Sequence, residues 1–360
     1  MARRIDVDGL TAGVIAGSRA HLARAITLVE STLPAHREAA RDLLARVADS
    51  PHTRVGAAPA DESGSDTLQS IRAQSIRVGV SGVPGAGKST FINALGLRLI
   101  DRGHRVAVLA VDPSSPTTGG SVLGDRTRMG ALTMHEAAFV RPSPTANHLG
   151  GVARATREAM LLVEAAGYDV VIVETVGVGQ SEVAVADMVD TFLMLALARS
   201  GDQLQGIKRG ILELADVIAV NKADGDNAGE ARVTARELAI AMKLISGDSL
   251  KRRVPVLTCS AVERVGLDEV WDEVLAHREW RGEQPGGLVG FRAGQQERWM
   301  WSMVEATLLD SLKGDPEVRR LASSLRSGLA SHRVSALEGA AQVLEAFARA
   351  VPEQSWAPRD

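Results

Sequence analysis

Short apolar runs alternate with amphipathic stretches through the middle of this 360-residue chain. Each run is rich in Val, Ile, Leu or Ala and has the length of one strand, and the stretches between them repeat apolar positions at helical spacing. The runs lie at 77–81, 105–111, 169–174, 191–197, 216–221 and 254–258. This alternation predicts an α/β fold in which helices cover both faces of a mostly parallel sheet.

Outside this region only helical periodicity is found. Residues 8–50 predict two or three helices, and residues 51–70 have the Pro, Gly, Ser and Asp content of a linker. Beyond Pro285, further helices are predicted at 292–314, 316–327 and 334–350. The chain is therefore divided into an N-terminal helical extension with its linker, an α/β domain and a C-terminal helical region, at residues 1–75, 76–281 and 282–360.

The C-terminal helices carry an apolar face that the sequence leaves without an assigned partner. Its members are Trp299, Met300, Met303, Val304, Leu308 and Leu309. Such a face either packs on the preceding domain or forms the interface of a dimer, because a stripe of this length must be buried somewhere.

A glycine-rich loop follows the first strand of the α/β region. The sequence GVPGAGKST fills every position of the pattern G-x-x-x-x-G-K-[ST] and precedes a helical stretch. Its glycines let backbone N–H groups surround a β-phosphate, and the helix adds the positive end of its dipole. Lys88 is expected at the β- and γ-phosphates, and the Ser89 hydroxyl on Mg²⁺. Nucleotide contacts are predicted for Gly82, Val83, Pro84, Gly85, Ala86, Gly87, Lys88, Ser89 and Thr90.

Three carboxylates are placed to hold Mg²⁺ or a water molecule beside this loop. Asp112 ends a strand at the edge where open parallel sheets bind ligands, although a turn or cap before Pro113 is an alternative. Glu174 ends a buried strand at the Walker-B position. Asp125 and Arg126 lie in a glycine-rich segment typical of a switch, and ordinary solvated charges fit equally. The catalytic candidates are Lys88, Asp112 and Glu174, and the metal candidates are Ser89, Asp112, Asp125 and Glu174.

A second motif, N-K-x-D, closes the strand at 216–220. Its Asp224 carboxylate would accept two hydrogen bonds from guanine that adenine cannot donate. Ser260 and Ala261 follow the next strand, and the Ala261 N–H would meet guanine O6. Cys259 is interpreted as a buried structural thiol. GTP rather than ATP is the predicted nucleotide. Base contacts are predicted for Asn221, Lys222, Asp224, Ser260 and Ala261.

Composition and charge narrow the range of partners. The formal net charge is −3 at pH 7, and no long run of Lys or Arg is present, so nucleic acid is not an expected partner. The single cysteine allows no internal disulfide and fits a reducing compartment. No run reaches the roughly 18 apolar residues of a membrane span, and the first residues lead into no signal sequence. We expect a cytoplasmic protein with no membrane association.

Several consecutive motifs over residues 76–281 resemble those of one family. They are GVPGAGKST, VDPSSPTTGGSVLGDRTRM, RPSP with LGGVARAT, ETVGVGQSEVAVADMVD, GDQLQGIKRGI and NKADGD. In this order they resemble the MeaB/ArgK/MMAA family, the methylmalonyl-CoA mutase-associated GTPases of the SIMIBI class. The resemblance implies homodimers formed through the C-terminal helices, with Mg²⁺ and GTP or GDP bound. It also implies a chaperone of adenosylcobalamin-dependent methylmalonyl-CoA mutase that gates cofactor loading and protects or reactivates the mutase.

The resemblance also implies a mobile loop that communicates with the mutase. The segment 201–208 matches this loop, and Lys208 is the candidate for responding to the nucleotide state. The chain departs from the family just before it, because Ala198-Arg199-Ser200 stands where the family has a Pro-containing entry. A charge is added there and a stiffening residue is missing, so the departure concerns coupling to the partner and not GTP binding.

The expected reaction is in-line attack of water on the γ-phosphate of GTP, with Mg²⁺ and Lys88 neutralising the developing charge. Gln180 is a candidate for positioning the water, and an ordinary exposed glutamine is the alternative. Turnover should be slow without a partner. Three other functions stay open: a kinase or ATPase linked to amino-acid transport, a nucleotide-switched binding module for another cobalamin enzyme or metalloenzyme, and a metal-insertion GTPase. The last would normally carry a His- or Cys-rich tract, and the sequence has none.

Overall fold

Seven strands form one parallel sheet in the order β3-β2-β4-β1-β5-β6-β7. The computed structural model describes residues 5–31, 33–49, 75–111, 129–142, 149–175, 181–198, 209–246 and 252–353. The strands are β1 (Ile76–Gly82), β2 (Val106–Val111), β3 (Ala138–Arg141), β4 (Val170–Thr175), β5 (Thr191–Leu197), β6 (Val217–Asn221) and β7 (Val256–Thr258). The predicted α/β class with a parallel sheet is confirmed.

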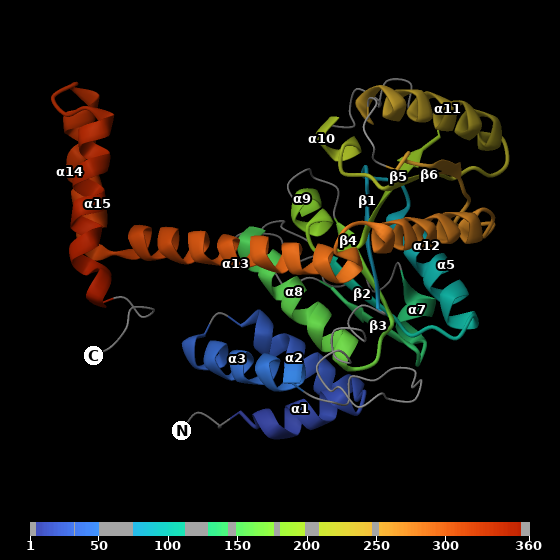
Figure 1. The fold of residues 1–360 in the computed structure, drawn as a ribbon, viewed down its shortest axis with the longest axis horizontal. Coiled ribbons are helices and arrows are strands. Elements are labelled where there is room, and N and C mark those ends of the chain that lie inside the picture. Colours follow the sequence, from blue (N-terminus) through green and yellow to red (C-terminus); the bar gives the residue numbers. More distant parts are fainter. Residues whose placement is uncertain are drawn as a thin grey trace. The chain divides into compact units, whose positions relative to one another are not determined.

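Helices cover both faces of the sheet (Figure 1). Those of the α/β region are α5 (Lys88–Asp101), α7 (Gly130–Met134), α8 (Leu149–Ala165), α9 (Ser181–Ala186), α10 (Arg209–Leu212), α11 (Asn227–Ser246) and α12 (Leu267–Glu283). Alternate residues of one strand face opposite cores. In β4, Val171 and Val173 join the core that holds α8 and α9, whereas Val170 and Ile172 join the core that holds α5, α7 and α12.

Three helices precede the sheet, at the upper limit of the sequence prediction. They are α1 (Val7–Ile15), α2 (Arg19–Glu30) and α3 (Pro34–Asp49). The Asp6 side chain caps α1 by accepting a hydrogen bond from the Gly9 N–H at 2.9 Å. Leu22, Ile26 and Val29 of α2 are buried in the same core as α8, so these helices form part of the layer on that face of the sheet.

The strand β3 is absent from the sequence prediction, which contains six strands. It has four residues and lies at the edge of the sheet, where it pairs only with β2 from Val106↔Ala138 to Leu109↔Arg141. A run this short gives little periodic signal, and its hydrogen bonds come from a strand more than 25 residues away in sequence. The last strand is also shorter than predicted, because β7 begins at Val256 rather than at Val254.

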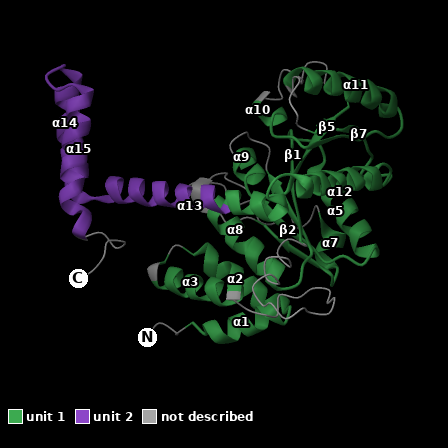
Figure 2. Cartoon of the chain, in the orientation of Figure 1, with its two compact units in different colours: residues 1–295 green, residues 296–360 purple. Residues whose placement is uncertain are grey.

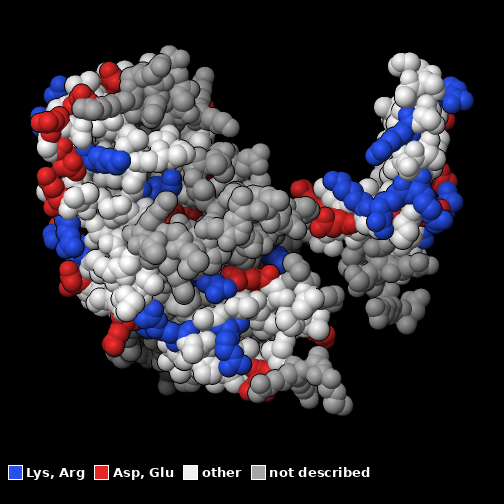
Figure 3. All heavy atoms as spheres, turned by 180° about the vertical axis from the view of Figure 1, so that it is seen from behind, with Lys and Arg blue, Asp and Glu red and all other residues white. Residues whose placement is uncertain are grey.

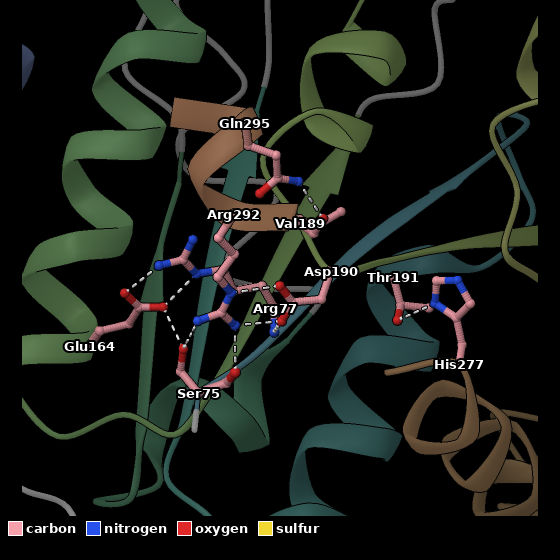
Figure 4. A network of polar contacts seen from close by, with 9 residues as sticks. All are labelled: Ser75, Arg77, Glu164, Val189, Asp190, Thr191, His277, Arg292 and Gln295. Carbon is pink, nitrogen blue, oxygen red and sulfur yellow. Dashed lines mark hydrogen bonds and ion pairs between the residues drawn. The ribbon is translucent and has the colours of Figure 1, made fainter. Parts of the chain in front are cut away.

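A buried ionic network fixes the first turns of α13 (Gly287–Gly314) beside the sheet (Figure 4). The Arg292 guanidinium donates to both oxygens of the Asp190 carboxylate, at 2.8 and 2.6 Å, and to the Ser75 carbonyl at 2.7 Å. Arg77 of β1 makes a second bidentate pair with Glu164 of α8, at 2.6 and 2.8 Å. Two cations and two anions are thus buried together, each with hydrogen-bonding partners.

Further hydrogen bonds nearby also hold α13 and α12 against the sheet and α8. The Gln295 side-chain amide of α13 donates to the Val189 carbonyl at 2.8 Å, and the Arg157 guanidinium of α8 donates to the Gln295 carbonyl at 3.2 Å. His277 of α12 lies 2.9 Å from the Thr191 hydroxyl at the start of β5. The amino ends of β1 and β5 therefore hold α12 and the first turns of α13.

We expect Arg292→Ala to lower the free energy of unfolding by about 3 to 5 kcal/mol at neutral pH, because it leaves Asp190 buried without its bidentate partner. Burial alone would raise the pKa of the Asp190 carboxyl, but Arg292 and Arg77 hold it below its ordinary value. The stabilisation is therefore present above about pH 4 and is lost as the pH falls through the lowered pKa. Urea unfolding at several pH values measures this.

The exposed Arg326, in another helix, provides the control for that experiment. Arg326→Ala should leave the unfolding midpoint nearly unchanged, since surface substitutions rarely shift stability by more than about 0.5 kcal/mol. Equal effects of the two substitutions would contradict the role given to the network.

The chain divides into two compact units, residues 1–295 and 296–360 (Figure 2). Unit 2 contains the rest of α13 together with α14 (Pro316–Ala330), α15 (Ala336–Ala350) and a short 3₁₀ helix at Val351–Glu353. Its buried core is small and is formed by Val318, Ala346 and Phe347. The domain limits at 75/76 and 281/282 stay a prediction, and α13 crosses the division between the units.

The apolar face predicted on the C-terminal helices is exposed over much of α13 in unit 2. Met300, Val304, Leu308 and Leu309 of that face are exposed, and so is Trp301, which the prediction did not include and which has 56% of its surface accessible. Among the residues that the structure describes, no helix is both long and apolar enough to cross a membrane. On the face drawn in Figure 3, acidic and basic side chains of unit 1 are interspersed, so neither sign of charge dominates it.

Candidate functional site

The predicted phosphate loop joins β1 to α5 and has the backbone that its glycines permit. Gly85 and Gly87 have φ angles of 84° and 83°, in the left-handed region that favours glycine. Gly87 is also crowded, because a Cβ atom there would lie 2.9 Å from the side-chain nitrogen of Asn221. A Cβ atom on Gly82 would lie 2.3 Å from the Leu195 carbonyl oxygen. Close neighbours therefore require glycine at positions 82 and 87, and the left-handed backbone favours it at 85 and 87.

Lys88, the first residue of α5, folds back across this loop. Its Nζ donates to the Gly82 carbonyl oxygen at 2.8 Å. Burial lowers the pKa of the Lys88 ammonium, and the carboxylates of Glu174 and Glu182 oppose that shift. The ammonium is thus held directly over the loop, where the phosphates of a nucleotide would lie.

Ser89 and Glu174 lie next to each other although 85 residues separate them in sequence. The Ser89 hydroxyl donates to Glu174 Oε1 at 3.0 Å, and Glu174 is buried at the carboxyl end of β4. The following residue, Thr175, donates from its hydroxyl to the Ser81 hydroxyl of β1 at 2.8 Å. Strands β4 and β1 are neighbours in the sheet, and this pairing brings the two predicted metal candidates together.

Asn221 links the phosphate loop to the loop that follows β7. Its side-chain nitrogen donates to the Ala86 carbonyl at 2.8 Å, and its side-chain oxygen accepts from the Ala261 N–H at 3.1 Å. All three residues are buried. The predicted contact of the Ala261 N–H with guanine O6 therefore requires this amide to be shared with Asn221 or released by it.

Asp224 and Ser260, predicted as base contacts, are hydrogen-bonded to each other. The Ser260 hydroxyl donates to Asp224 Oδ2 and accepts from the Glu263 N–H at 3.0 Å. The Ala223 N–H donates to the Cys259 carbonyl at 3.0 Å, which joins the two loops through their backbones as well. Lys222 has a φ of 60°, an uncommon backbone conformation for a residue with a long side chain, and strain of this kind is concentrated at functional sites.

Cys259 is a structural thiol, as the sequence indicated. Only 1% of its surface is exposed, and burial raises its pKa to about 12. Its sulfur donates a weak hydrogen bond to the side-chain oxygen of Asn221 at 3.7 Å. The thiol therefore stays protonated and helps to orient Asn221.

Several predicted site residues lie outside the described part of the chain. They are Asp112, Asp125, Arg126, Arg199, Gln180 and the segment 201–208 with Lys208. The assignment of the other site residues to GTP and Mg²⁺ also stays a prediction. Within the described residues, no group of three or more His, Cys, Asp or Glu side chains is arranged to hold a metal ion.

Sequence reasoning missed one charged residue at this site. Glu182, in the first turn of α9, is completely buried and its charge acts on Lys88. Burial of a carboxylate is costly unless a cation or hydrogen bonds compensate it. The sequence feature that could have identified Glu182 is its position, two residues after Gln180 and in the same motif as Glu174.

These features define the class of the protein. A glycine-rich loop between β1 and α5 carries a lysine and a hydroxyl at the start of the helix, and an N-K-x-D loop is bonded to it through Asn221. The chain is a P-loop GTPase with a parallel sheet.

Comparison with known proteins gives the family. The sequence profile described as "Methylmalonyl Co-A mutase-associated GTPase MeaB" matches residues 56–317. A probable GTPase of Mycobacterium tuberculosis is 53% identical over 339 residues, which cover 94% of each chain. The mitochondrial methylmalonic aciduria type A homolog of Mus musculus is 44% identical, over 95% of this chain and 79% of that protein. This chain belongs to the MeaB family of methylmalonyl-CoA mutase-associated GTPases.

A solved structure supports the same grouping. The crystal structure of an LAO/AO transport system kinase matches with a TM-score of 0.72 and 34% sequence identity. The match covers 97% of this chain and 99% of that chain, so it extends to the helices that flank the sheet.

Proposed function

We propose that this protein is a Mg²⁺-dependent GTPase that acts as a chaperone of adenosylcobalamin-dependent methylmalonyl-CoA mutase, gating cofactor loading and protecting or reactivating the mutase. The observation that supports the GTP assignment is the hydrogen bond from the Asn221 side-chain nitrogen to the Ala86 carbonyl, at 2.8 Å, which joins the N-K-x-D motif to the phosphate loop. The mutase assignment is supported by membership of the MeaB family and by the name of the mouse relative.

In this proposal the phosphate loop binds the β-phosphate through its N–H groups, and Lys88 leaves the Gly82 carbonyl to contact the β- and γ-phosphates. A water oxygen forms a bond to the γ-phosphorus while the bond to the β–γ bridging oxygen breaks, which releases GDP and inorganic phosphate. Lys88 neutralises charge that develops on the phosphate oxygens. Asp224 and Ser260 would select guanine.

The residues present fit a magnesium ion. Mg²⁺ prefers oxygen ligands and usually keeps several waters. The adjacent Ser89 hydroxyl and Glu174 carboxylate, 3.0 Å apart, supply oxygen donors of this kind at the start of α5. We propose that Ser89 binds the ion and that Glu174 holds it through water, with Asp112 and Asp125 as further candidates. When bound, the ion would supply positive charge beside the β- and γ-phosphates.

We also propose that a second copy of the chain covers the exposed stripe of α13. The stripe contains Trp301, Val304 and Leu308 at helical spacing, and aromatic anchors of this kind are enriched at protein interfaces. Sedimentation equilibrium of the full chain tests this proposal. A monomer at micromolar concentration would contradict it.

The experiment that tests the main proposal is GTP hydrolysis with and without the methylmalonyl-CoA mutase of the same organism, with ATP as the control nucleotide. We expect slow release of phosphate from GTP by the protein alone, clear stimulation by the mutase, and no stimulated hydrolysis of ATP. The same assay after removal of Mg²⁺ with a chelator should show turnover close to the uncatalysed rate.

Other outcomes distinguish the alternatives. GTP turnover that ignores the mutase would leave the GTPase in place and contradict the proposed partner. Transfer of the γ-phosphate to a protein rather than to water would favour the kinase, the activity that the name of the matched crystal structure gives to that relative. An absence of phosphate release with the mutase present would favour a binding module.

A further inference from the structure

Helix α11 carries two apolar faces on nearly opposite sides. One contains Ala231, Leu238 and Met242, which are buried against β5 and β6 with α10. The other contains Val233, Ile240 and Leu244. Because successive helical residues are rotated by about 100°, these three side chains lie within about 40° of one another, on the side away from the sheet. A surface helix of a globular protein normally has polar residues there.

The second face is open to solvent over about three turns. Val233, Ile240 and Leu244 expose 53%, 63% and 79% of their surfaces. They span about 16 Å along the helix axis. Elsewhere among the described residues of unit 1, large exposed apolar side chains are single residues on different elements, apart from the two valines of one loop, Val262 and Val265. Val233, Ile240 and Leu244, in contrast, form a row on one helix face. Contiguous exposed apolar residues mark interaction sites, whereas single ones are normal on protein surfaces.

Charged residues border this stripe with opposite signs on its two sides. Arg232, Arg236 and Lys243 form a row along one side, and all three are exposed. They make no hydrogen bond or ion pair with the described part of the chain. Arg232 and Arg236 are also four residues apart, an arrangement of like charges that destabilises an isolated helix. Glu230 and Glu237 lie along the other side.

We propose that this face of α11 docks an amphipathic helix of another protein, with an apolar stripe bordered by Asp or Glu on the side that meets the basic row. Apolar anchors separated by about two turns and one turn along a helix suit a partner helix, and the basic row fixes which edge of that helix must be acidic.

The docking surface adjoins the base-recognition motif in the chain. The Asn227 N–H at the start of α11 donates to the Asp224 carbonyl at 3.0 Å. The proposal nevertheless does not depend on the mutase assignment, because it rests on exposure and charge alone. The residues that form the proposed docking surface are not among those assigned to the phosphates or to guanine.

The test uses the full chain and two synthetic helical peptides that share one apolar stripe. One peptide has acidic residues along the edge predicted to meet Arg232, Arg236 and Lys243, and the other has basic residues there. Fluorescence anisotropy measures binding of each. We expect the acidic peptide to bind at least about tenfold more tightly than the basic one, with an affinity that falls as salt is raised.

Two variants and one control locate the binding. Ile240→Ser with Leu244→Ser should weaken the acidic peptide about tenfold or more, and Arg232→Glu with Arg236→Glu should reverse the preference between the peptides. Met134→Ser, which removes an exposed apolar side chain from α7, should change neither. Unchanged GTP hydrolysis and circular dichroism show that the variants fold.

Three results would overturn the proposal. They are no binding of the acidic peptide, equal binding of both peptides by the unmodified chain, or no effect of the Ile240 and Leu244 substitutions. A fourth is a shift in the sedimentation of the α11 variants without peptide, which would assign the surface to a second copy of the chain. Failure of mutase stimulation, in contrast, leaves this proposal unaffected.

Discussion

Lys88→Ala is expected to lower single-turnover GTP hydrolysis by about 10²- to 10³-fold, the loss typical of removing one group that stabilises developing charge. In the structure the Lys88 ammonium lies over the phosphate loop. Among the described residues its hydrogen bond is to the Gly82 carbonyl of the same loop, so the substitution removes charge from the reaction without removing a link between distant elements. Release of labelled inorganic phosphate measures the rate directly.

Two further lysine variants make this result specific. Lys88→Arg keeps the positive charge but changes its geometry, and should recover only part of the activity. Lys313→Ala, at the end of α13 in unit 2, should leave turnover unchanged. Full turnover by Lys88→Ala would show that the proposed hydrolytic mechanism is wrong.

Asp224→Asn is expected to weaken GTP binding by at least about 10²-fold and to shift selectivity towards xanthine nucleotides. The carboxylate is assigned to the N1–H and amino group of guanine, and an amide nitrogen in its place would face those donors instead of accepting from them. Xanthine has a carbonyl where guanine has the amino group, and that carbonyl can accept from Asn. Competition between GTP and XTP in a binding assay measures the change.

Asp226 provides the matched control, because it is an exposed aspartate two residues further along the same loop. Asp226→Asn should retain the preference for GTP. The hydroxyl of Ser260 can still donate to an asparagine oxygen at position 224, so loss of GTP binding by Asp224→Asn should occur without loss of the fold. An unchanged GTP preference in Asp224→Asn would exclude the assigned base contact.

In helix α11 the sequence pattern predicts the helix but does not decide which of its apolar residues are buried. Its apolar residues form two sets at helical spacing, and the sequence alone does not say which set is buried. Packing against β5 and β6 buries Leu238 and Met242 and leaves Ile240 and Leu244 exposed. The exposed face of α11 is therefore a result of how this helix packs on the sheet, which the sequence analysis did not predict.

The sequence by itself determined the phosphate loop, the N-K-x-D motif, the parallel α/β class and the family. These features depend on local requirements: glycine for left-handed backbone at Gly85 and Gly87, and strand and helix periods that repeat over short distances. Strand ends of a parallel sheet meet at one edge, so the neighbourhood of Ser89 and Glu174 also followed from the sequence.

Only the tertiary structure decided the short edge strand β3, the bridge formed by Asn221 and the burial of Glu182 beside Lys88. It also decided the pairing of Arg292 with Asp190, which lie 102 residues apart. Each of these depends on contacts between segments distant in the chain. A single sequence does not reveal which residue pairs with a given charged side chain, because the ion-pair partner is determined by the packing that buries both residues.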